Sequence, residues 1–444
     1  MTQLLFARIC DMILKILNKR GFILDIKERI KSSAKESGLY TAKFLKWLVL
    51  GLIIGAICGG LGAVFGKALT FATVTRSEHH ELLWLLPVGG IISVAIYKLC
   101  KTTDIGTNQV FESVREERRI PMALAPAIFS GTVLTHLFGG SAGREGAALQ
   151  LGGSVAATMS KILKLDTKSH HILTLSGMGA FFSALFGTPI GAAVFALEVV
   201  SVGQFCSAAI FPCAVASVTA FKLSTALGTH PERFTVNIIP QFNWDTLWKV
   251  AVIAALEALT SIVFCKAMHY TSHYFKRFFK NEFLRIIVGS AIIIALTLLL
   301  GTYDYNGGGI EVIDRIFNEN SVRYEAFILK IIFTAITIGC GFKGGEIVPT
   351  IFIGATLGAA LSLLLGLPLG FGAAIGISAL LCGVTNCPLA TIFLSIELFG
   401  SEGLVFYTLS AVTSFILSGY SSLYTGQKLF FSKLNDEIID RNAD

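Results

Sequence analysis

Glu145 is the residue whose surroundings most strongly indicate chemistry in this sequence. It follows Gly139, Gly140 and Gly143, which interrupt an apolar run, and a long stretch of small and apolar residues comes after it. This pattern predicts a carboxylate in the first turn of a helix, where free backbone N–H groups and the helix dipole favour negative charge. A carboxylate there can occupy the place of a bound anion. Because protonation would release Glu145 and open the site, we predict a gating and proton-transfer role for this residue.

The structural alternative for Glu145 is an ion pair with its neighbour Arg144. Adjacent residues on a helix do not face each other well, which disfavours that pairing. A charged side chain inside a membrane is also costly, so an ionisable residue at such depth indicates function by default.

A second glutamate has similar surroundings in the other half of the chain. Glu346 follows Gly344 and Gly345 and is succeeded by Ile347, Val348 and Pro349. At this position it would bring a second helix N-terminus to the same centre. The alternative is a capping carboxylate that satisfies local N–H groups, and the sequence leaves both interpretations open.

The composition places these carboxylates in a membrane. Hydrophobic residues make up 53% of the 444 residues and charged residues only 15%, whereas soluble proteins carry about 25% charged residues. Apolar runs long enough to span or enter a bilayer recur along the chain, and glycine and proline interrupt several of them. Such broken segments are tolerated only in a protein interior or along a cavity, so they point to a substrate site. The net charge of +7 is scattered and forms no stripe for nucleic acid.

The motifs occur twice in the same order. The glycine–glutamate motif is followed by a Thr-Pro segment that leads to Glu198, and Gly344–Pro349 is followed by a Cys-Pro segment that leads to Glu397. This order predicts two structural repeats. The predicted division of the chain is an N-terminal segment at 1–44, a first membrane repeat at 45–230, a second membrane repeat at 245–426, and a tail at 427–444.

The N-terminal segment does not read as a signal peptide, because charged residues interrupt its apolar positions. Those positions instead predict an amphipathic helix with a basic face: Leu4, Leu5, Ile9, Met12, Ile13 and Ile16. Basic residues outnumber acidic ones up to residue 44, which favours a cytoplasmic N-terminus against the inner leaflet.

The other ionisable residues in the apolar segments, and the cysteines, are predicted to have structural roles. Glu198 and Glu397 lie near the far ends of their segments and are predicted to be structural partners at the membrane boundary. His136 lies inside an apolar run and is predicted to be a satisfied buried histidine. The nine cysteines contain no CxxC pair, so neither a zinc site nor a disulfide framework is indicated. We therefore predict no metal and no cofactor.

The stretch Gly139–Gly146 resembles the gating-glutamate motif of the CLC family of chloride channels and anion/proton antiporters. Gly344–Pro349 resembles the second anion-binding element of that family, and the segments after Pro189 and Pro388 resemble its paired helices. The resemblance implies an all-α polytopic membrane protein with two inverted repeats of broken and re-entrant helices. It also implies a homodimer in membrane lipid with both termini in the cytoplasm, here in the inner membrane of a bacterium.

Departures from the chloride-type pattern resemble the fluoride/proton antiporter branch of the family. Gly106, Thr107 and Asn108 replace the Gly-Ser-Gly of the first anion-binding loop. Val199 occupies the position of an internal glutamate that proton-coupled chloride antiporters carry, and Glu346 replaces an apolar residue. In the fluoride branch the glutamate matching Glu346 takes part in fluoride handling, with a threonine two residues later. In the present chain the residue at that position is Val348.

The resemblance implies an anion site gated by Glu145, with the central pore tyrosine at Tyr424 or, as an alternative alignment, at Tyr420. The anion-binding residues that it implies are Gly106, Thr107, Asn108, Gly143, Arg144, Gly146, Gly345, Glu346, Ile347, Val348 and Tyr424. Fluoride is small and strongly hydrated, so a dry site needs several concentrated donors to replace its water. Backbone N–H groups at two helix starts and the polar side chains of this set are suitable donors.

The sequence therefore predicts a secondary transporter that exports fluoride coupled to proton entry. A chloride channel or chloride/proton antiporter of the same fold remains the alternative, and effective competition by chloride would favour it. An intramembrane enzyme that uses Glu145 and His136 as acid and base is a further hypothesis, which the lack of a nucleophile or metal motif disfavours. The predicted partners are fluoride or chloride, protons, membrane lipid and a second copy of the chain, without nucleic acid.

Overall fold

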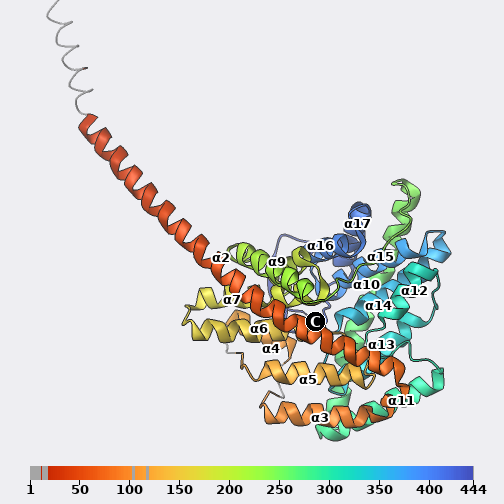
Figure 1. Cartoon of the computed structure of the whole chain (residues 1–444). Helices are drawn as coiled ribbons and strands as arrows, with labels where there is room; N and C mark the ends of the chain where they lie inside the picture. The colour runs from red at the N-terminus through yellow and green to blue at the C-terminus, as the bar shows by residue number, and fades with distance from the viewer. Residues whose placement is uncertain (1–11, 13–18, 103–105, 117–119, 444) are drawn as a thin grey trace, which may run out of the picture. The chain divides into compact units, whose positions relative to one another are not determined.

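The computed structural model describes residues 12, 19–102, 106–116 and 120–443. The chain divides into two compact units, Met1–Leu50 and Gly51–Asp444. Helix α2 runs from Lys19 to Glu78 (Figure 1). The amphipathic helix predicted from Leu4 to Ile16 lies outside the described residues, apart from Met12.

Apolar helices dominate the second unit. Those long enough to cross a membrane, within the described residues, are Glu36–Glu78 of α2, η1 with α3 (His80–Leu85 and Leu86–Leu99), η2 with α9 (Ser207–Ala209 and Ile210–Ala226), α10 (Trp244–Phe278), α11 (Glu282–Leu300) and α14 (Ile347–Leu365). The shorter apolar helices are α5 (Leu124–Leu137), α8 (Pro189–Glu198), α13 (Ala326–Gly339), α15 (Leu369–Thr385), α16 (Pro388–Phe399) and α17 (Leu404–Leu417). The chain is therefore an integral membrane protein built partly from helices too short to span a bilayer alone.

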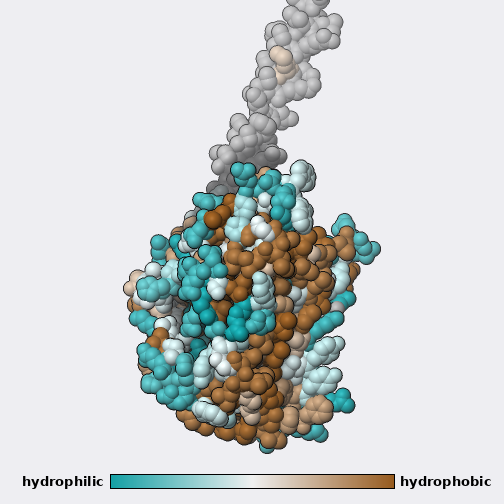
Figure 2. Space-filling model, turned by 90° about the vertical axis from the view of Figure 1, so that its right-hand side faces the viewer, coloured by the Kyte–Doolittle hydropathy of each residue, from teal (hydrophilic) through white to brown (hydrophobic). Residues whose placement is uncertain are grey.

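The outward-facing side chains of these helices are strongly apolar. Figure 2 shows hydrophobic surface extending over one face of the molecule, with hydrophilic residues beside it. On α10 and α11 the exposed large side chains include Leu259, Val263, Leu298 and Leu299. Water-soluble proteins rarely expose an apolar surface of this extent, whereas a hydrocarbon environment requires it.

The interior is built from closely packed helix pairs. Helix α6 (Glu145–Ile162) packs on α7 (Thr167–Phe186), and α14 packs on α15 in the same way. Glycine permits both contacts, because a Cβ at Gly152 would lie 2.2 Å from the carbonyl oxygen of Gly177, and one at Gly376 would lie 2.1 Å from that of Gly354. Small residues that bring helix backbones together are typical of membrane proteins.

The two halves follow the same order of elements. Helices α4 (Thr107–Glu116), α5, α6, α7 and α8 form the first series, and α12 (Ile310–Glu319), α13, α14, α15 and α16 form the second. Helices α8 and α16, the last of each series, pack against each other. The glycine–glutamate motifs stand before α6 and α14, at corresponding places.

A small sheet, to which no sequence pattern pointed, closes the chain. Strand β1 (Ser201–Val202) pairs in parallel with β2 (Lys428–Phe431), which pairs antiparallel with β3 (Ile438–Asn442). The buried side chains of Val202, Leu429 and Ala443 form its core. Residues after 427 are therefore tied to the end of α8 by main-chain hydrogen bonds.

Candidate functional site

The two glycine–glutamate motifs meet in an isolated antiparallel bridge. The N–H of Gly143 donates to the carbonyl oxygen of Gly345 (2.6 Å), and the N–H of Gly345 donates to that of Gly143 (2.7 Å). A Cβ at Gly345 would lie 2.6 Å from the backbone nitrogen of Gly146 and 2.8 Å from that of Glu145. Because α6 and α14 begin beside this bridge, their free N–H groups point into one small volume.

The carboxylate of Glu145 fills that volume. Its side chain is fully buried, and Oε2 accepts hydrogen bonds from the backbone N–H groups of Arg144 (3.0 Å) and Val348 (3.1 Å). These donors come from the starts of α6 and α14 respectively. The other oxygen, Oε1, has no hydrogen-bond partner. An anion in the same place would be offered the same N–H groups, so carboxylate and anion would compete for one position.

The ion pair between the side chains of Glu145 and Arg144 is not formed. The guanidinium of Arg144 instead makes a short ion pair with Glu232 and lies over the ring of Phe186, 5.9 Å from its centroid. Only the backbone of Arg144 reaches Glu145. Glu232 therefore holds the arginine away from the carboxylate beside it.

Glu346 is the N-cap residue of α14, yet it makes no side-chain capping hydrogen bond. Its Oε2 atom is buried and has no hydrogen-bond partner. The capping alternative is therefore not realised. The carboxylate instead borders a cavity that it shares with Tyr424.

Two cavities approach the bridge. One of about 270 Å³ is lined by Arg76, His136, Gly143, Arg144, Glu232 and Val348, among others. Another of about 560 Å³ is lined by Gly106, Thr107, Asn108, Gln150, Lys276, Arg285, Lys343, Gly344, Glu346 and Tyr424, among others. They share no lining residue, and Glu145 lines neither. The carboxylate thus lies at the closed point between the two cavities.

The lining of the second cavity distinguishes between Tyr424 and Tyr420 as the pore tyrosine. Tyr424 lines it, and its buried hydroxyl has no hydrogen-bond partner. Tyr420 does not line it, because its hydroxyl contacts Ser432 (3.1 Å) and its ring lies under Arg441. Of the two, only Tyr424 is placed to donate to an anion in this cavity.

Thr107 and Asn108 also line this cavity, but their side chains make different hydrogen bonds. Oδ1 of Asn108 accepts from the N–H of Gly426 (3.0 Å), and Nδ2 donates to the hydroxyl oxygen of Thr425 (2.9 Å). Asn108 therefore positions the loop after Tyr424, and the second N–H of its amide is left as a donor. Thr107 accepts from Nε2 of Gln150 (3.0 Å), which leaves its hydroxyl hydrogen available.

The predicted site residues thus lie along the two cavities and at the closed point between them. Gly143, Arg144 and Val348 border the first cavity, whereas Gly106, Thr107, Asn108, Glu346 and Tyr424 border the second. Gly146, Gly345 and Ile347 are buried beside Glu145, between the two.

Comparison with known proteins agrees with this arrangement. Residues 88–419 match the family model described as voltage gated chloride channel. The chain belongs to this family, the CLC proteins. A chloride/fluoride channel protein of Pseudomonas syringae pv. tomato is 35% identical over 399 residues, which cover 87% of each chain. An H(+)/Cl(-) exchange transporter of Vibrio campbellii is 27% identical and covers 88% of this chain and 90% of its own length.

Solved CLC structures have the same fold. The crystal structure of a CLC-type fluoride/proton antiporter superposes with a TM-score of 0.84 at 34% identity, covering 87% of this chain and 98% of that one. A slow cyanobacterial Cl-/H+ antiporter has a TM-score of 0.72 at 21% identity, covering 84% of this chain and 94% of that one. The membrane fold predicted from the sequence, with two inverted CLC-type repeats, is confirmed.

The paired CLC helices α8 and α16 are joined by two carboxylates outside the anion site. Glu198 accepts from the N–H groups of Leu389 (3.3 Å) and Ala390 (2.8 Å) at the start of α16. Glu397 accepts from Ile190 (2.9 Å) and Gly191 (2.7 Å) at the start of α8. Each glutamate caps the helix of the other repeat, which is a structural role, as predicted. His136 is buried with Nδ1 against the carbonyl oxygen of Thr132 (2.9 Å).

A loop before α12 supports the break that precedes Glu145. Asn306 donates to the carbonyl oxygen of Gly139 (2.8 Å), and the N–H of Gly307 donates to that of Gly140 (3.2 Å). The fully buried Lys330 donates to the carbonyl oxygens of Tyr305 (3.1 Å) and Gly307 (2.7 Å). Lys330 was not predicted to be important, although a lysine inside an apolar run is itself a signal.

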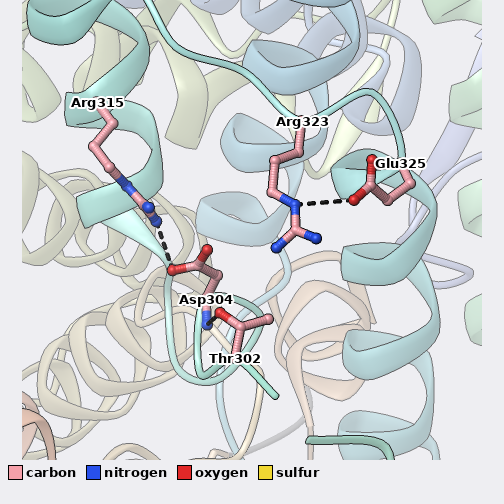
Figure 3. A network of polar contacts seen from close by, with 5 residues as sticks. All are labelled: Thr302, Asp304, Arg315, Arg323 and Glu325. Carbon is pink, nitrogen blue, oxygen red and sulfur yellow. Dashed lines mark hydrogen bonds and ion pairs between the residues drawn. The ribbon is translucent and has the colours of Figure 1, made fainter. Parts of the chain in front are cut away.

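Ion pairs hold the outer part of the same loop (Figure 3). Arg315 on α12 donates to Asp304 (2.5 Å), whose backbone N–H reaches the hydroxyl of Thr302 (3.3 Å). Arg323 pairs with Glu325 (2.9 Å) just before α13. The loop is thereby fixed at both ends, which keeps the glycine break in place.

A buried network supports the loop that carries Tyr424. Nε2 of Gln427 donates to the carbonyl oxygens of Val199 (2.9 Å) and Thr385 (2.6 Å), while its Oε1 accepts from Asn386 (3.1 Å) and Ser422 (3.0 Å). Lys433 extends the network by donating to Oδ1 of Asn386 (2.5 Å). Gln427 and Lys433 lie in the tail, where no sequence pattern singled them out.

Proposed function

We propose that this protein is a CLC-type secondary transporter that exports fluoride in exchange for protons. One observation carries the proposal: the buried carboxylate of Glu145 occupies the N–H groups of two helix starts at the closed point between two cavities. A group that blocks an anion site when charged, and vacates it when protonated, couples anion movement to proton movement.

The exchange follows from this competition. Deprotonated Glu145 holds the N–H groups and keeps the cavities apart. A proton from the first cavity neutralises the carboxylate, weakens its hydrogen bonds and lets it swing away. An anion from the second cavity then takes the vacated donors. The anion then leaves through the first cavity and Glu145 releases its proton to the second, so the two ions have moved in opposite directions when the carboxylate returns.

Charges on the second cavity support anion entry from that side. Lys276, Arg285 and Lys343 line it together with Glu282 and Glu346, so basic residues outnumber acidic ones and attract anions to this cavity. Thr107 and Tyr424 provide hydroxyl groups further in. Small, strongly hydrated fluoride gains most from such concentrated donors.

The choice of fluoride rests on named residues and on the relatives. Glu346 and Val199 depart from the chloride pattern, and two similar proteins carry names that include fluoride. Val348 stands where the fluoride branch has threonine, but it binds Glu145 through its backbone N–H, which valine supplies equally well. Chloride/proton exchange is the second candidate, because similar H(+)/Cl(-) exchangers share the fold.

We further propose that the protein is a homodimer in the lipid of a bacterial inner membrane, with both termini cytoplasmic. In this proposal the chain consists of an N-terminal segment at 1–44, membrane repeats at 45–230 and 245–426, and a tail at 427–444. Basic residues in the last turn of α10, Lys276 and Arg277, and Lys280 just after it support a cytoplasmic position for that end.

The test is ion-coupled efflux from proteoliposomes loaded with fluoride or with chloride. The proposal expects fluoride to leave rapidly and to drive proton uptake, with little movement of chloride. Chloride efflux as fast as fluoride efflux would favour the second candidate.

A further inference from the structure

A buried carboxyl group that the transport step above does not use lies in the middle of α10. Glu257 is fully buried, and neither Oε1 nor Oε2 has a hydrogen-bond partner. Glu145 and Glu198, by contrast, each accept hydrogen bonds from two backbone N–H groups. Buried polar groups in proteins are nearly always paired, so the carboxyl group of Glu257 requires a physical explanation.

The helices that pack on α10 bring no charged partner to Glu257. Of these helices, α14, α15 and α17 contain no aspartate, glutamate, lysine, arginine or histidine, and their titratable residues are Cys382 on α15 and Tyr407 on α17. Helix α13, which also packs on α10, carries Lys330, and its Nζ donates to two carbonyl oxygens of the loop before α12 instead.

The lysines of α10 itself are also remote from this carboxyl group. Lys249, one of the two nearest in sequence, lies more than two helical turns before Glu257 and pairs with Asp245 at the start of the helix. Lys266, the other, lies more than two turns after Glu257 and is exposed. Glu257 therefore has no cation beside it along its own helix.

Glycine residues of α15 make room for a polar seam between α10, α15 and α17. A Cβ at Gly376 would lie 2.7 Å from Oε1 of Glu257. A Cβ at Gly383 would lie 2.6 Å from Oγ of Ser261, one turn after Glu257, and 2.7 Å from Oγ of Ser414 on α17. Oγ of Ser414 is likewise buried without a hydrogen-bond partner. The carboxyl group thus lies in direct contact with the backbone of α15.

We propose that Glu257 is a proton-binding site separate from Glu145, and that its carboxyl group is neutral while α10 packs on α15. An unpaired carboxylate in an apolar interior is far more costly than a neutral carboxyl group, so a buried acid of this kind takes up a proton. Loss of that proton leaves a charge without a partner. The charge favours separation of α10 from α15 and entry of water between them.

The contact between α10 and α15 is connected to the gate through α14. A Cβ at Gly376 would lie 2.1 Å from the carbonyl oxygen of Gly354, so Gly376 contacts α14 as well as Glu257. Gly354 follows Val348, whose N–H binds Glu145, by about 9 Å along the helix. Separation of α15 from α10 therefore disturbs the helix that supplies a donor of the gate. This effect on transport rests on the proposed function, whereas the protonation of Glu257 does not.

Infrared difference spectroscopy on the purified full chain tests the protonation directly. In the spectrum of the wild type at neutral pH minus that of Glu257→Gln, we expect the carbonyl stretch of a neutral carboxyl group. Glu402→Gln, at an exposed position before α17, is the control and should remove a carboxylate band instead. A carboxylate band in the Glu257 difference would overturn the proposal. Glu257→Leu gives the same readout if the glutamine variant folds poorly.

The pH dependence of stability tests whether the proton belongs to the folded state. A glutamate in water ionises above about pH 4.3, so the unfolded chain loses this proton while the folded chain keeps it. The melting temperature of the wild type in detergent should therefore fall relative to that of Glu257→Gln as the pH rises from about 5 to about 9. The other carboxyl groups are common to both proteins and cancel. Parallel curves would overturn the proposal.

The link to the gate is tested with both proteins in proteoliposomes. The ratio of fluoride efflux by Glu257→Gln to efflux by the wild type should rise at least about twofold between about pH 7 and pH 9, because only the wild type acquires the buried charge. A ratio that stays constant with pH would overturn this link. If the wild type moves no fluoride, the proposed function fails, and the infrared and melting data still decide the protonation of Glu257.

Discussion

Oε2 of Glu145 accepts a hydrogen bond from the backbone N–H of Val348, 3.1 Å away, although the two residues are separated by 203 positions and lie in different repeats. This contact joins the starts of α6 and α14 through one carboxylate. Any event that removes the negative charge weakens both ends of the link at once. The gate is therefore a shared property of the two repeats.

Gly345→Ala tests the bridge that creates this site. A Cβ there would lie within 2.8 Å of two backbone nitrogens, so we expect loss of transport and a large fall in folded yield. Gly60→Ala is the matched control, since a Cβ at this helical glycine meets nothing within 4 Å. Size-exclusion yield and fluoride efflux measure both. Normal transport by Gly345→Ala would mean that the backbone approach is not required.

Glu346→Gln tests the second carboxylate. Its Oε2 has no protein partner and borders the cavity of Tyr424, so we expect fluoride exchange to fall roughly tenfold or more with the fold intact. Glu319→Gln, at an exposed position of α12, is the control for removing one negative charge. Equal rates in the two variants would assign Glu346 no part in transport.

Asn108→Ala tests whether this residue positions the pore loop. The change removes the bonds to Gly426 and Thr425, so we expect a loss of about 1–3 kcal/mol in stability together with slower transport. Thr425→Val removes one of the two bonds and should have the smaller effect. Thermal unfolding in detergent, followed by efflux assays, ranks the variants. A transport defect in Asn108→Ala with unchanged stability would indicate direct anion binding instead.

The glutamates of this site could be predicted from sequence because their signal is local. Glycines that break an apolar run, followed by Glu145 or Glu346, specify a helix start with a carboxylate wherever they occur. The position of Asn108 was also predicted, but not its contacts with the loop after Tyr424. These partners lie more than three hundred residues away along the chain, and nothing near Asn108 in sequence indicates them.

The contacts of the C-terminal tail could likewise not be predicted from local sequence. Strand β1 has only two residues, Ser201 and Val202, too few to show an alternating pattern, and its partners Lys428 and Leu429 are more than two hundred residues away along the chain. Gln427 looks like an ordinary polar residue in a tail. It donates to the carbonyl oxygens of Val199 and Thr385, at the ends of two helices, and accepts from the side chains of Asn386 and Ser422, which only the folded chain brings together.

Lys433→Met tests the tail network through pH. Burial lowers the pKa of Lys433 from 10.5 to about 8, against a smaller opposing effect of nearby thiols. Between these values the unfolded chain holds a proton that the folded chain lacks, so folding stability from this group rises with pH through that window. Wild type should therefore gain up to about 3 kcal/mol relative to Lys433→Met between pH 8 and 10.5.

The measurement for Lys433 is the melting temperature in detergent across this range, with exposed Lys280→Met as the control. The slope against pH is the readout, because the loss of hydrogen bonds to Asn386 and Phe415 lowers stability of the methionine variant at every pH. Parallel curves for wild type and Lys433→Met would contradict the buried titration.

The most direct test of the central claim records fluoride and pH together in one proteoliposome assay, for wild type and for Glu145→Gln. Glutamine keeps the size of the side chain but cannot take up or release the proton. The account predicts fluoride efflux with proton uptake in the wild type, and fluoride efflux without proton uptake in the variant. Proton uptake that persists in Glu145→Gln would contradict the account, because another group would then have to carry the proton.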